Sequence, residues 1–173
     1  MVIDKLKDYM QLIKFTLSLT VVFSSVISYL LAPNITFNFL SVLLLFIGGL
    51  LITGSANAIN QMTEKDTDAL MKRTAKRPVA SGRMSVSEAS AFAAISAIAG
   101  TLIIGYWFNW TSALLGLFSL FLYGFIYTPL KKVHSVSVLV GAVPGALPCL
   151  IGWVAATGEM SAGGRVLFAI QFF

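Results

Sequence analysis

An apolar run that ends in a dense group of polar side chains, FNFLSVLLLFIGGLLITGSANAINQMTEKDTD over residues 37–68, decides how this sequence folds. Its first part, up to about Asn60, is long and apolar enough for a transmembrane helix, which needs about 20 such residues. Its second part places amide and carboxylate side chains directly at the end of that helix. The run therefore predicts a membrane-spanning helix that carries a polar site at one end.

The composition of the whole chain excludes a soluble domain. Of its 173 residues, 57% are hydrophobic and only 11% are charged, and the mean hydropathy is +0.86. A soluble domain has about 25% charged residues, which it needs to cover its surface. We therefore expect an all-α, polytopic membrane protein surrounded by the lipid bilayer.

Five apolar runs are long enough to cross a membrane, and a sixth begins near Ala162. The approximate bounds of the five are Phe15 to Ala32, Phe37 to Asn60, Val86 to Phe108, Thr111 to Tyr127 and Ser137 to Ala156. The sixth run is still apolar at Phe173, where the sequence stops in what would be the middle of a bilayer. This pattern predicts five full spans and the start of another.

The basic residues predict the orientation of these spans. All but one of the 12 Lys and Arg residues lie before the first span, after the second or after the fourth, and only Arg165 belongs to the other side. Because cytoplasmic loops carry the excess of Lys and Arg, the N-terminus and both basic loops are expected in the cytoplasm, in a bacterial-type inner membrane. The net charge of +5 thus reports topology, and we expect no nucleic acid partner.

The polar residues at the end of the second span share one helix face. Asn57, Asn60, Glu64 and Asp68 follow one another at spacings of three or four residues, whereas Asp66 falls off that face. Two carboxylates one turn apart repel each other unless a cation lies between them. Oxygen ligands without a Cys or His cluster favour a hard cation such as Mg²⁺, which typically takes one or two protein carboxylates.

A basic stretch follows the acidic one, with Lys72, Arg73, Lys76 and Arg77 before Pro78, and then Arg83. The Arg guanidinium suits phosphate oxygens, and Lys supplies a point charge. An acidic cluster followed by a basic one predicts a site for a metal-bound diphosphate. A loop that merely obeys the positive-inside rule would explain the cations, but it would not explain the acidic face.

These residues resemble known motifs. Asn60-x-x-x-Glu64-x-x-x-Asp68 resembles the first aspartate-rich motif, NxxxDxxxD, of the UbiA superfamily of intramembrane prenyltransferases, with Glu in place of the middle Asp. The longer string from Asn57 to Pro78 resembles the haem O synthase branch of that superfamily. Tyr127-x-x-x-Lys131 resembles the family's Tyr-x-x-x-Lys element. Residues 141–153 resemble its Gly- and Pro-rich fifth helix, with Cys149 where a second Pro is usual.

The resemblance implies a transmembrane helical bundle of the UbiA prenyltransferase type, with about nine helices and a second acidic motif in its C-terminal half. Residues 1–173 would then be one prenyltransferase domain, truncated at the C-terminus. Part of the metal and diphosphate site would lie outside this sequence, and the fragment would be inactive on its own.

The resemblance also implies a reaction, in which farnesyl diphosphate donates its farnesyl group to a vinyl group of haem B and gives haem O. Mg²⁺ would be the cofactor, haem B the acceptor substrate, and the haem pathway of the terminal oxidases the source of a protein partner. The residues that engage the metal and diphosphate would be Asn60, Glu64 and Asp68, of which Glu64 and Asp68 hold Mg²⁺ directly or through water. The supporting residues would be Asn57, Asp66 and Tyr127, and the phosphate contacts would be Lys72, Arg73, Arg77 and Lys131.

Two alternatives remain open. A UbiA-type enzyme that prenylates an aromatic or quinone-precursor acceptor would share the diphosphate site, although the string from Met71 to Pro78 argues against it. A membrane transporter would use Glu64 and Asp68 as a cation relay and the fifth span as a gate. Transporter sites lie near the middle of the membrane, whereas these acids lie at the end of a span.

Overall fold

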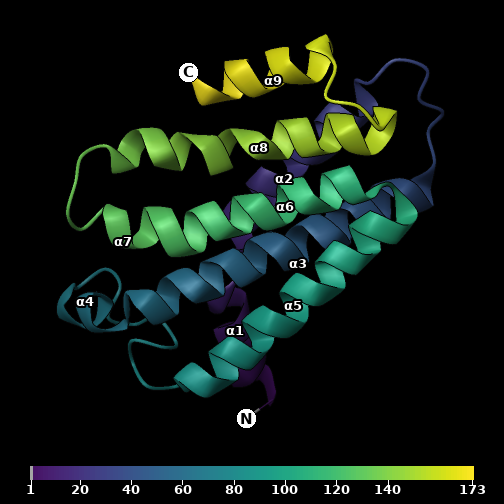
Figure 1. The fold of residues 1–173 in the computed structure, drawn as a ribbon. Coiled ribbons are helices and arrows are strands. Elements are labelled where there is room, and N and C mark those ends of the chain that lie inside the picture. Colours follow the sequence, from purple (N-terminus) through teal and green to yellow (C-terminus); the bar gives the residue numbers. More distant parts are fainter. Residues whose placement is uncertain (1) are drawn as a thin grey trace.

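The computed structural model describes residues 2–173, with side chains from Ile3 onward, and every regular element in that range is a helix (Figure 1). In chain order the elements are α1 (Val2–Leu12), α2 (Phe15–Leu30), α3 (Phe39–Thr63), α4 (Lys65–Leu70), α5 (Val86–Trp107), α6 (Trp110–Phe121), the π-helix η1 (Leu122–Tyr127), α7 (Thr128–Leu130), α8 (Ser137–Thr157) and α9 (Ala162–Phe172).

Four of the five predicted spans are confirmed, apart from small differences at their ends. Within the described residues, four helical stretches are long and apolar enough to cross a membrane: α3, α5, the continuous run 110–130, and α8. The first predicted span corresponds to α2, which counts as a spanning element only if it is taken together with α1, from which it is bent by 54°. This arrangement is that of an integral membrane protein. The sixth run forms α9, which begins at Ala162 as expected.

Helix α1 was not predicted, because its charged residues interrupt the apolar pattern. It is amphipathic, and its inner side is attached to the start of α5. Lys5 Nζ lies 3.0 Å from Glu88 Oε1, and the ring of Tyr9 lies 5.3 Å from that of Phe92. Arg83, the last cation of the predicted basic stretch, donates from Nε to Asp8 on α1 at 2.8 Å. These contacts place the α1–α2 joint beside the end of α3.

Helices α3 and α5 pack side by side along most of their length (Figure 1). Small residues allow their backbones to approach. A Cβ atom at Gly100 would lie only 2.8 Å from the carbonyl oxygen of Gly48, and Ser55 Oγ donates to the Ala93 carbonyl at 2.8 Å. Close packing through small residues is the usual way in which transmembrane helices associate.

The fourth span contains a π-helical segment just before Pro129. Proline lacks the backbone N–H and its ring clashes with the carbonyl four residues earlier, so a regular α-helix cannot continue through it. The wider turns of η1 accommodate this residue. Thr128 Oγ1 donates to the Tyr123 carbonyl at 2.7 Å, the same oxygen that accepts from the Thr128 backbone N–H. Thr128 Oγ1 thereby lies within reach of Asn60 Nδ2 at the end of α3, from which it accepts at 3.2 Å.

Helix α8 contains two prolines and packs closely against α2. Pro148 cannot donate to the carbonyl of Pro144, and Ser119 Oγ on α6 donates to that oxygen at 3.4 Å. A Cβ atom at Gly152 would lie 1.9 Å from the carbonyl oxygen of Ser25. The α2–α8 contact therefore brings two backbones together, with no room for a side chain between them.

Candidate functional site

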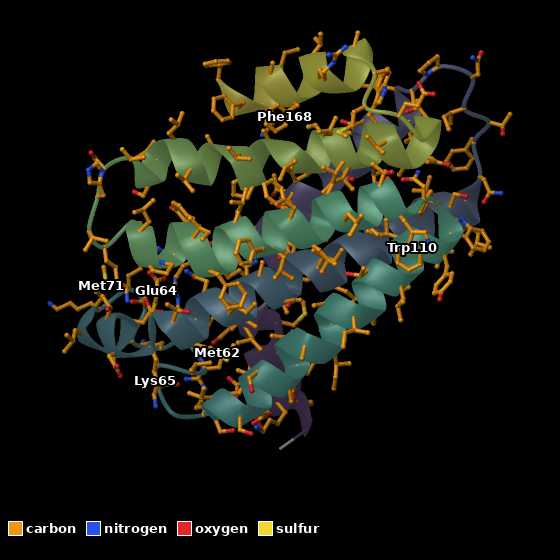
Figure 2. The ribbon with its side chains drawn as sticks, in the orientation of Figure 1. Met62, Glu64, Lys65, Met71, Trp110 and Phe168 are labelled. Carbon is orange, nitrogen blue, oxygen red and sulfur yellow. The ribbon has the colours of Figure 1, made fainter. Side chains whose placement is uncertain are left out.

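The polar residues gather at the end of the bundle where α3, α4 and α7 meet. Glu64 lies there between the end of α3 and α4, and Trp110 marks the opposite end of the bundle (Figure 2). We call the group at this end the charged cluster. Its members are Lys14, Asn60, Glu64, Asp68, Arg77, Thr128 and Lys131.

Glu64 is the centre of the charged cluster and is only 8% exposed. Its Oε1 lies 2.7 Å from Lys131 Nζ, which comes from the end of α7. Its Oε2 accepts from Asn60 Nδ2 at 2.9 Å and lies 3.8 Å from Arg77 Nη1. One carboxylate thus joins three segments that are distant in the sequence.

Asp68 is the second buried carboxylate of the cluster. Its Oδ2 lies 2.5 Å from Arg77 Nη1, the same nitrogen that approaches Glu64. The backbone carbonyl of Asp68 accepts from Thr74 Oγ1 at 3.0 Å, which folds the following loop back on α4 and brings Arg77 into place. A single guanidinium nitrogen therefore supplies positive charge to both carboxylates.

The amide of Asn60 connects the acids to two further elements. It is fully buried, accepts from Lys14 Nζ at 2.7 Å, and donates from Nδ2 to Thr128 Oγ1 at 3.2 Å. Asn57, one turn earlier, donates to the Ile13 carbonyl and to Ser18 Oγ. Asn57 therefore holds the chain on both sides of Lys14. Within the part of the chain that the structure describes, it makes no hydrogen bond with Glu64 or Asp68.

Lys14 is the charged member of the cluster that the sequence did not identify, because it was interpreted only as a topology signal before the first span, and Thr128 was not identified either. It lies between α1 and α2 with φ 48° and ψ 59°, a left-handed conformation that costs a non-glycine residue roughly 1–2 kcal/mol. Partial burial, together with the nearby positive charges of Arg77 and Lys131, lowers the pKa of Lys14 to about 8. A strained, partly buried lysine beside other cations indicates a site for an anion.

Five of the predicted residues are not members of the cluster: Asn57 and Tyr127 lie beside it, and the other three are at the surface. Asp66, Lys72 and Arg73 are exposed, and none of them makes an ion pair or side-chain hydrogen bond with another described residue. The expected helix face is also not continuous, because α3 ends at Thr63 and α4 begins at Lys65. Glu64 and Asp68 nevertheless stay on the same side, since Asp68 N–H still donates to the Glu64 carbonyl at 2.7 Å.

Tyr127 borders the cluster through its ring. The ring lies 5.4 Å from that of Tyr123, and Lys131 Nζ lies 5.5 Å from its centre. Its far edge packs on α8, where a Cβ atom at Gly141 would be 2.6 Å away. The ring of Tyr127 thus contacts both Lys131 and the start of α8.

The donor set of the cluster fits Mg²⁺ in chemical type. Glu64 and Asp68 are buried carboxylates that share one cationic nitrogen, and Asn60 adds an amide oxygen. No group of three or more Asp, Glu, His or Cys side chains gathers anywhere in residues 3–173. Two carboxylates are nevertheless a usual protein contribution to a Mg²⁺ site that also takes water and substrate phosphate.

An apolar cavity of about 240 Å³ lies next to the cluster, between α2, α3, α6, η1 and α8. Asn57 and Tyr123 line the cavity at the end near the cluster, and Leu45 and Ile104 line it deeper in the bundle. Asn57 lies one helical turn from Asn60, and the carbonyl of Tyr123 accepts from Thr128. The site therefore combines a polar head region with an apolar pocket, an arrangement that suits an amphiphile with a polyanionic head.

Comparison with known proteins shows the family of this chain. The family model described as UbiA prenyltransferase family matches residues 21–173. The protoheme IX farnesyltransferase of Cytophaga hutchinsonii is 48% identical over 98% of this chain and 59% of the relative. The mitochondrial protoheme IX farnesyltransferase of Arabidopsis thaliana is 40% identical over 95% of this chain and 38% of the relative. The chain thus spans about half the length of such relatives.

Solved structures show the same fold. Digeranylgeranylglyceryl phosphate synthase superposes with a TM-score of 0.84 and 23% identity, over 98% of this chain and 59% of that one. A UbiA homolog from Archaeoglobus fulgidus, bound to GPP and Mg²⁺, gives a TM-score of 0.73 and 17% identity, over 95% of this chain and 60% of that one. On the match to residues 21–173 and this shared helical arrangement, the chain belongs to the UbiA prenyltransferase family.

Proposed function

We propose that the protein containing this chain transfers the farnesyl group of farnesyl diphosphate to a vinyl group of haem B and so makes haem O. The observation that carries this proposal is the junction of the charged cluster with the apolar cavity. A diphosphate head would lie at the cluster, and its isoprenoid chain would extend into the cavity. Family membership and the names of the relatives support the same reaction.

The roles of individual residues follow from their charges and positions. Arg77 and Lys131 pair with the two buried acids, and Lys14 donates to the neighbouring Asn60. The three cations come from separate segments, so together they would bind the oxygens of a diphosphate. Glu64 and Asp68 would hold Mg²⁺, with Asn60 beside them. When bound, the metal would neutralise charge that develops on the leaving diphosphate. Lys72 and Arg73, which are exposed, would contribute long-range attraction to anions.

The proposed reaction breaks the allylic carbon–oxygen bond of farnesyl diphosphate, and the electron pair leaves with the diphosphate. The cations of the cluster stabilise that leaving group where its charge grows. The electron pair of the haem vinyl group then forms the new carbon–carbon bond. A water molecule captures the resulting cation and loses a proton, which gives the hydroxyethylfarnesyl group. The apolar walls of the cavity keep other water from the allylic cation.

The metal, the substrates and the orientation are supported to different degrees. A structural neighbour binds GPP and Mg²⁺, which supports the metal-bound prenyl diphosphate. The relatives' name supports haem B as the acceptor. A partner in the terminal-oxidase haem pathway is proposed only from the reaction itself. The distribution of Lys and Arg supports an inner-membrane location with the charged cluster on the cytoplasmic side. We propose further that residues 1–173 supply the first acidic motif of a larger site.

The activity is tested with membranes that contain the protein. Membranes supplied with haem B, farnesyl diphosphate and Mg²⁺ are expected to accumulate haem O, identified by mass spectrometry, and chelation of the metal is expected to stop the reaction. Conversion of an aromatic acid or quinone precursor in place of haem B would overturn the choice of acceptor. Metal-independent cation transport without any prenyl transfer would overturn the enzyme class.

Replacing Lys14 tests the residue that only the structure identifies. Lys14→Met is expected to weaken binding of Mg²⁺-pyrophosphate by about tenfold, because one charge-assisted contact in a buried site is removed. Isothermal titration calorimetry in lipid nanodiscs measures this change. Lys7→Met is the matched control, since Lys7 is an exposed lysine of α1 and should bind as the wild type does. Equal effects of the two substitutions would show that Lys14 acts only through net charge.

A further inference from the structure

Gly145 stands apart from the other glycines, all of which lie in the described part of the chain. Two of the others, Gly82 and Gly158, have positive φ angles that favour glycine. Each of the remaining ones has an atom of another segment within 3.3 Å of where its Cβ would be, so a side chain there would require that neighbour to shift. At Gly145 no such atom lies within 4 Å.

Neither the backbone nor the packing therefore requires glycine at position 145. The residue lies in the interior of α8, between Pro144 and Pro148, where glycine is less favourable than alanine by roughly 1 kcal/mol. Its position lines the apolar cavity. Gly145 is exposed and has no atom within 4 Å of its Cβ position, so a side chain there would occupy open space at the wall of the cavity without displacing any protein atom.

We propose that Gly145 determines the length of isoprenoid chain that the cavity accepts, an inference that rests on the function proposed above. Gly145 lies one helical turn deeper than Gly141, which packs on Tyr127 beside the charged cluster. A chain that starts at the cluster must pass Gly145 before it reaches the deeper walls at Leu45 and Ile104. The glycine keeps that passage open to the units of the chain farthest from the diphosphate.

The size of the cavity limits how much of an isoprenoid chain it can hold. A dry apolar cavity of about 150 Å³ accommodates benzene. On the same scale, the present cavity of about 240 Å³ holds roughly ten carbon atoms, which is two of the three isoprene units of a farnesyl chain. A leucine side chain is close in size to one such unit. Gly145→Leu would therefore remove space for about one isoprene unit and leave the charged cluster, where the diphosphate would bind, unchanged.

The experiment measures binding of a series of ligands that differ only in chain length. The full chain in lipid nanodiscs is titrated with Mg²⁺ and inorganic pyrophosphate, or with the non-hydrolysable thiolodiphosphates of dimethylallyl, geranyl and farnesyl. The variants are Gly145→Leu and Gly145→Ala. Val138→Phe is the control, because it adds similar bulk on the same helix at a side chain that is 77% exposed.

Gly145→Leu is expected to weaken binding of the farnesyl compound by about tenfold, with pyrophosphate and the dimethylallyl compound unchanged within about twofold. Gly145→Ala should give a smaller change in the same direction, and Val138→Phe none. Unchanged farnesyl binding in Gly145→Leu would overturn the inference and leave the proposed function intact. Equal weakening of every ligand, pyrophosphate included, would also overturn it, because the effect would then be a general disturbance of the site. A wild type that binds none of the prenyl compounds would overturn both.

Discussion

Asp68→Asn is expected to reduce the rate of haem O formation by at least about 100-fold, the cost of losing one electrostatic group that stabilises a developing charge. The substitution keeps the shape of the side chain but removes its charge. Asp68 Oδ2 would no longer balance Arg77 Nη1, now 2.5 Å away, and the proposed metal would lose one of its two carboxylates. Glu64→Gln should act similarly, since Glu64 pairs with both Lys131 and Arg77.

The measurement compares rates of haem O formation at saturating farnesyl diphosphate with the affinity for Mg²⁺-pyrophosphate. Both variants should insert into the membrane and keep their helical content, because each replacement is isosteric. Glu159→Gln is the matched control: Glu159 is an exposed carboxylate beyond the C-terminus of α8, at the end of the bundle remote from the cluster. If either site variant turned over at the wild-type rate, the assignment of the acidic pair would be wrong.

The helices and the acidic residues of the site could be predicted from the sequence, because both leave a regular pattern in it. A lipid environment requires long apolar helices, so the spans appear directly as apolar runs, and their ends were placed to within a few residues. The spacing of Asn60, Glu64 and Asp68 also survives the break between α3 and α4, because the hydrogen bond from Asp68 to the Glu64 carbonyl preserves the helical register.

The partners of these acids could not be predicted, because they depend on tertiary contacts. Four basic residues follow Asp68 within nine positions, and only folding shows that Arg77 turns inward whereas Lys72 and Arg73 face outward. Lys14 reaches Asn60 because Asn57 binds the chain around it, a contact over more than forty residues. From the sequence, Lys14 and Arg83 could be interpreted only as positive charges. A charge alone does not indicate which residues it will contact in the folded protein.

Glycines illustrate the same limit within a single helix. Gly145 and Gly152 both lie in α8, seven residues apart, and both belong to the Gly- and Pro-rich stretch of the predicted fifth span. The structure places atoms of α2 against Gly152 and open space at Gly145. Identical residues in one apolar run therefore serve different purposes, and only the neighbouring helices distinguish them.

Gly152→Ala is accordingly expected to destabilise the bundle by about 3 kcal/mol, the upper end of the usual cost of overpacking. The new methyl group would lie 1.9 Å from the Ser25 carbonyl oxygen and 2.7 Å from its carbon. These are backbone atoms, so no rotamer change can relieve the clash, and α2 must move away from α8. Helix propensity acts in the opposite direction, because alanine is preferred over glycine by roughly 1 kcal/mol. A loss of stability would therefore report the interhelical contact itself.

Denaturation in mixed detergent micelles, followed by circular dichroism, measures this loss, and Gly145→Ala provides the internal comparison. It makes the same chemical change in the same helix without a neighbour to meet, so its stability should equal or slightly exceed that of the wild type. Ser25 and Ile151 line the cavity on either side of the α2–α8 contact. A separation of these helices should also weaken binding of the farnesyl compound while pyrophosphate binding is retained. Equal stability of the two alanine variants would mean that α2 and α8 do not pack through Gly152.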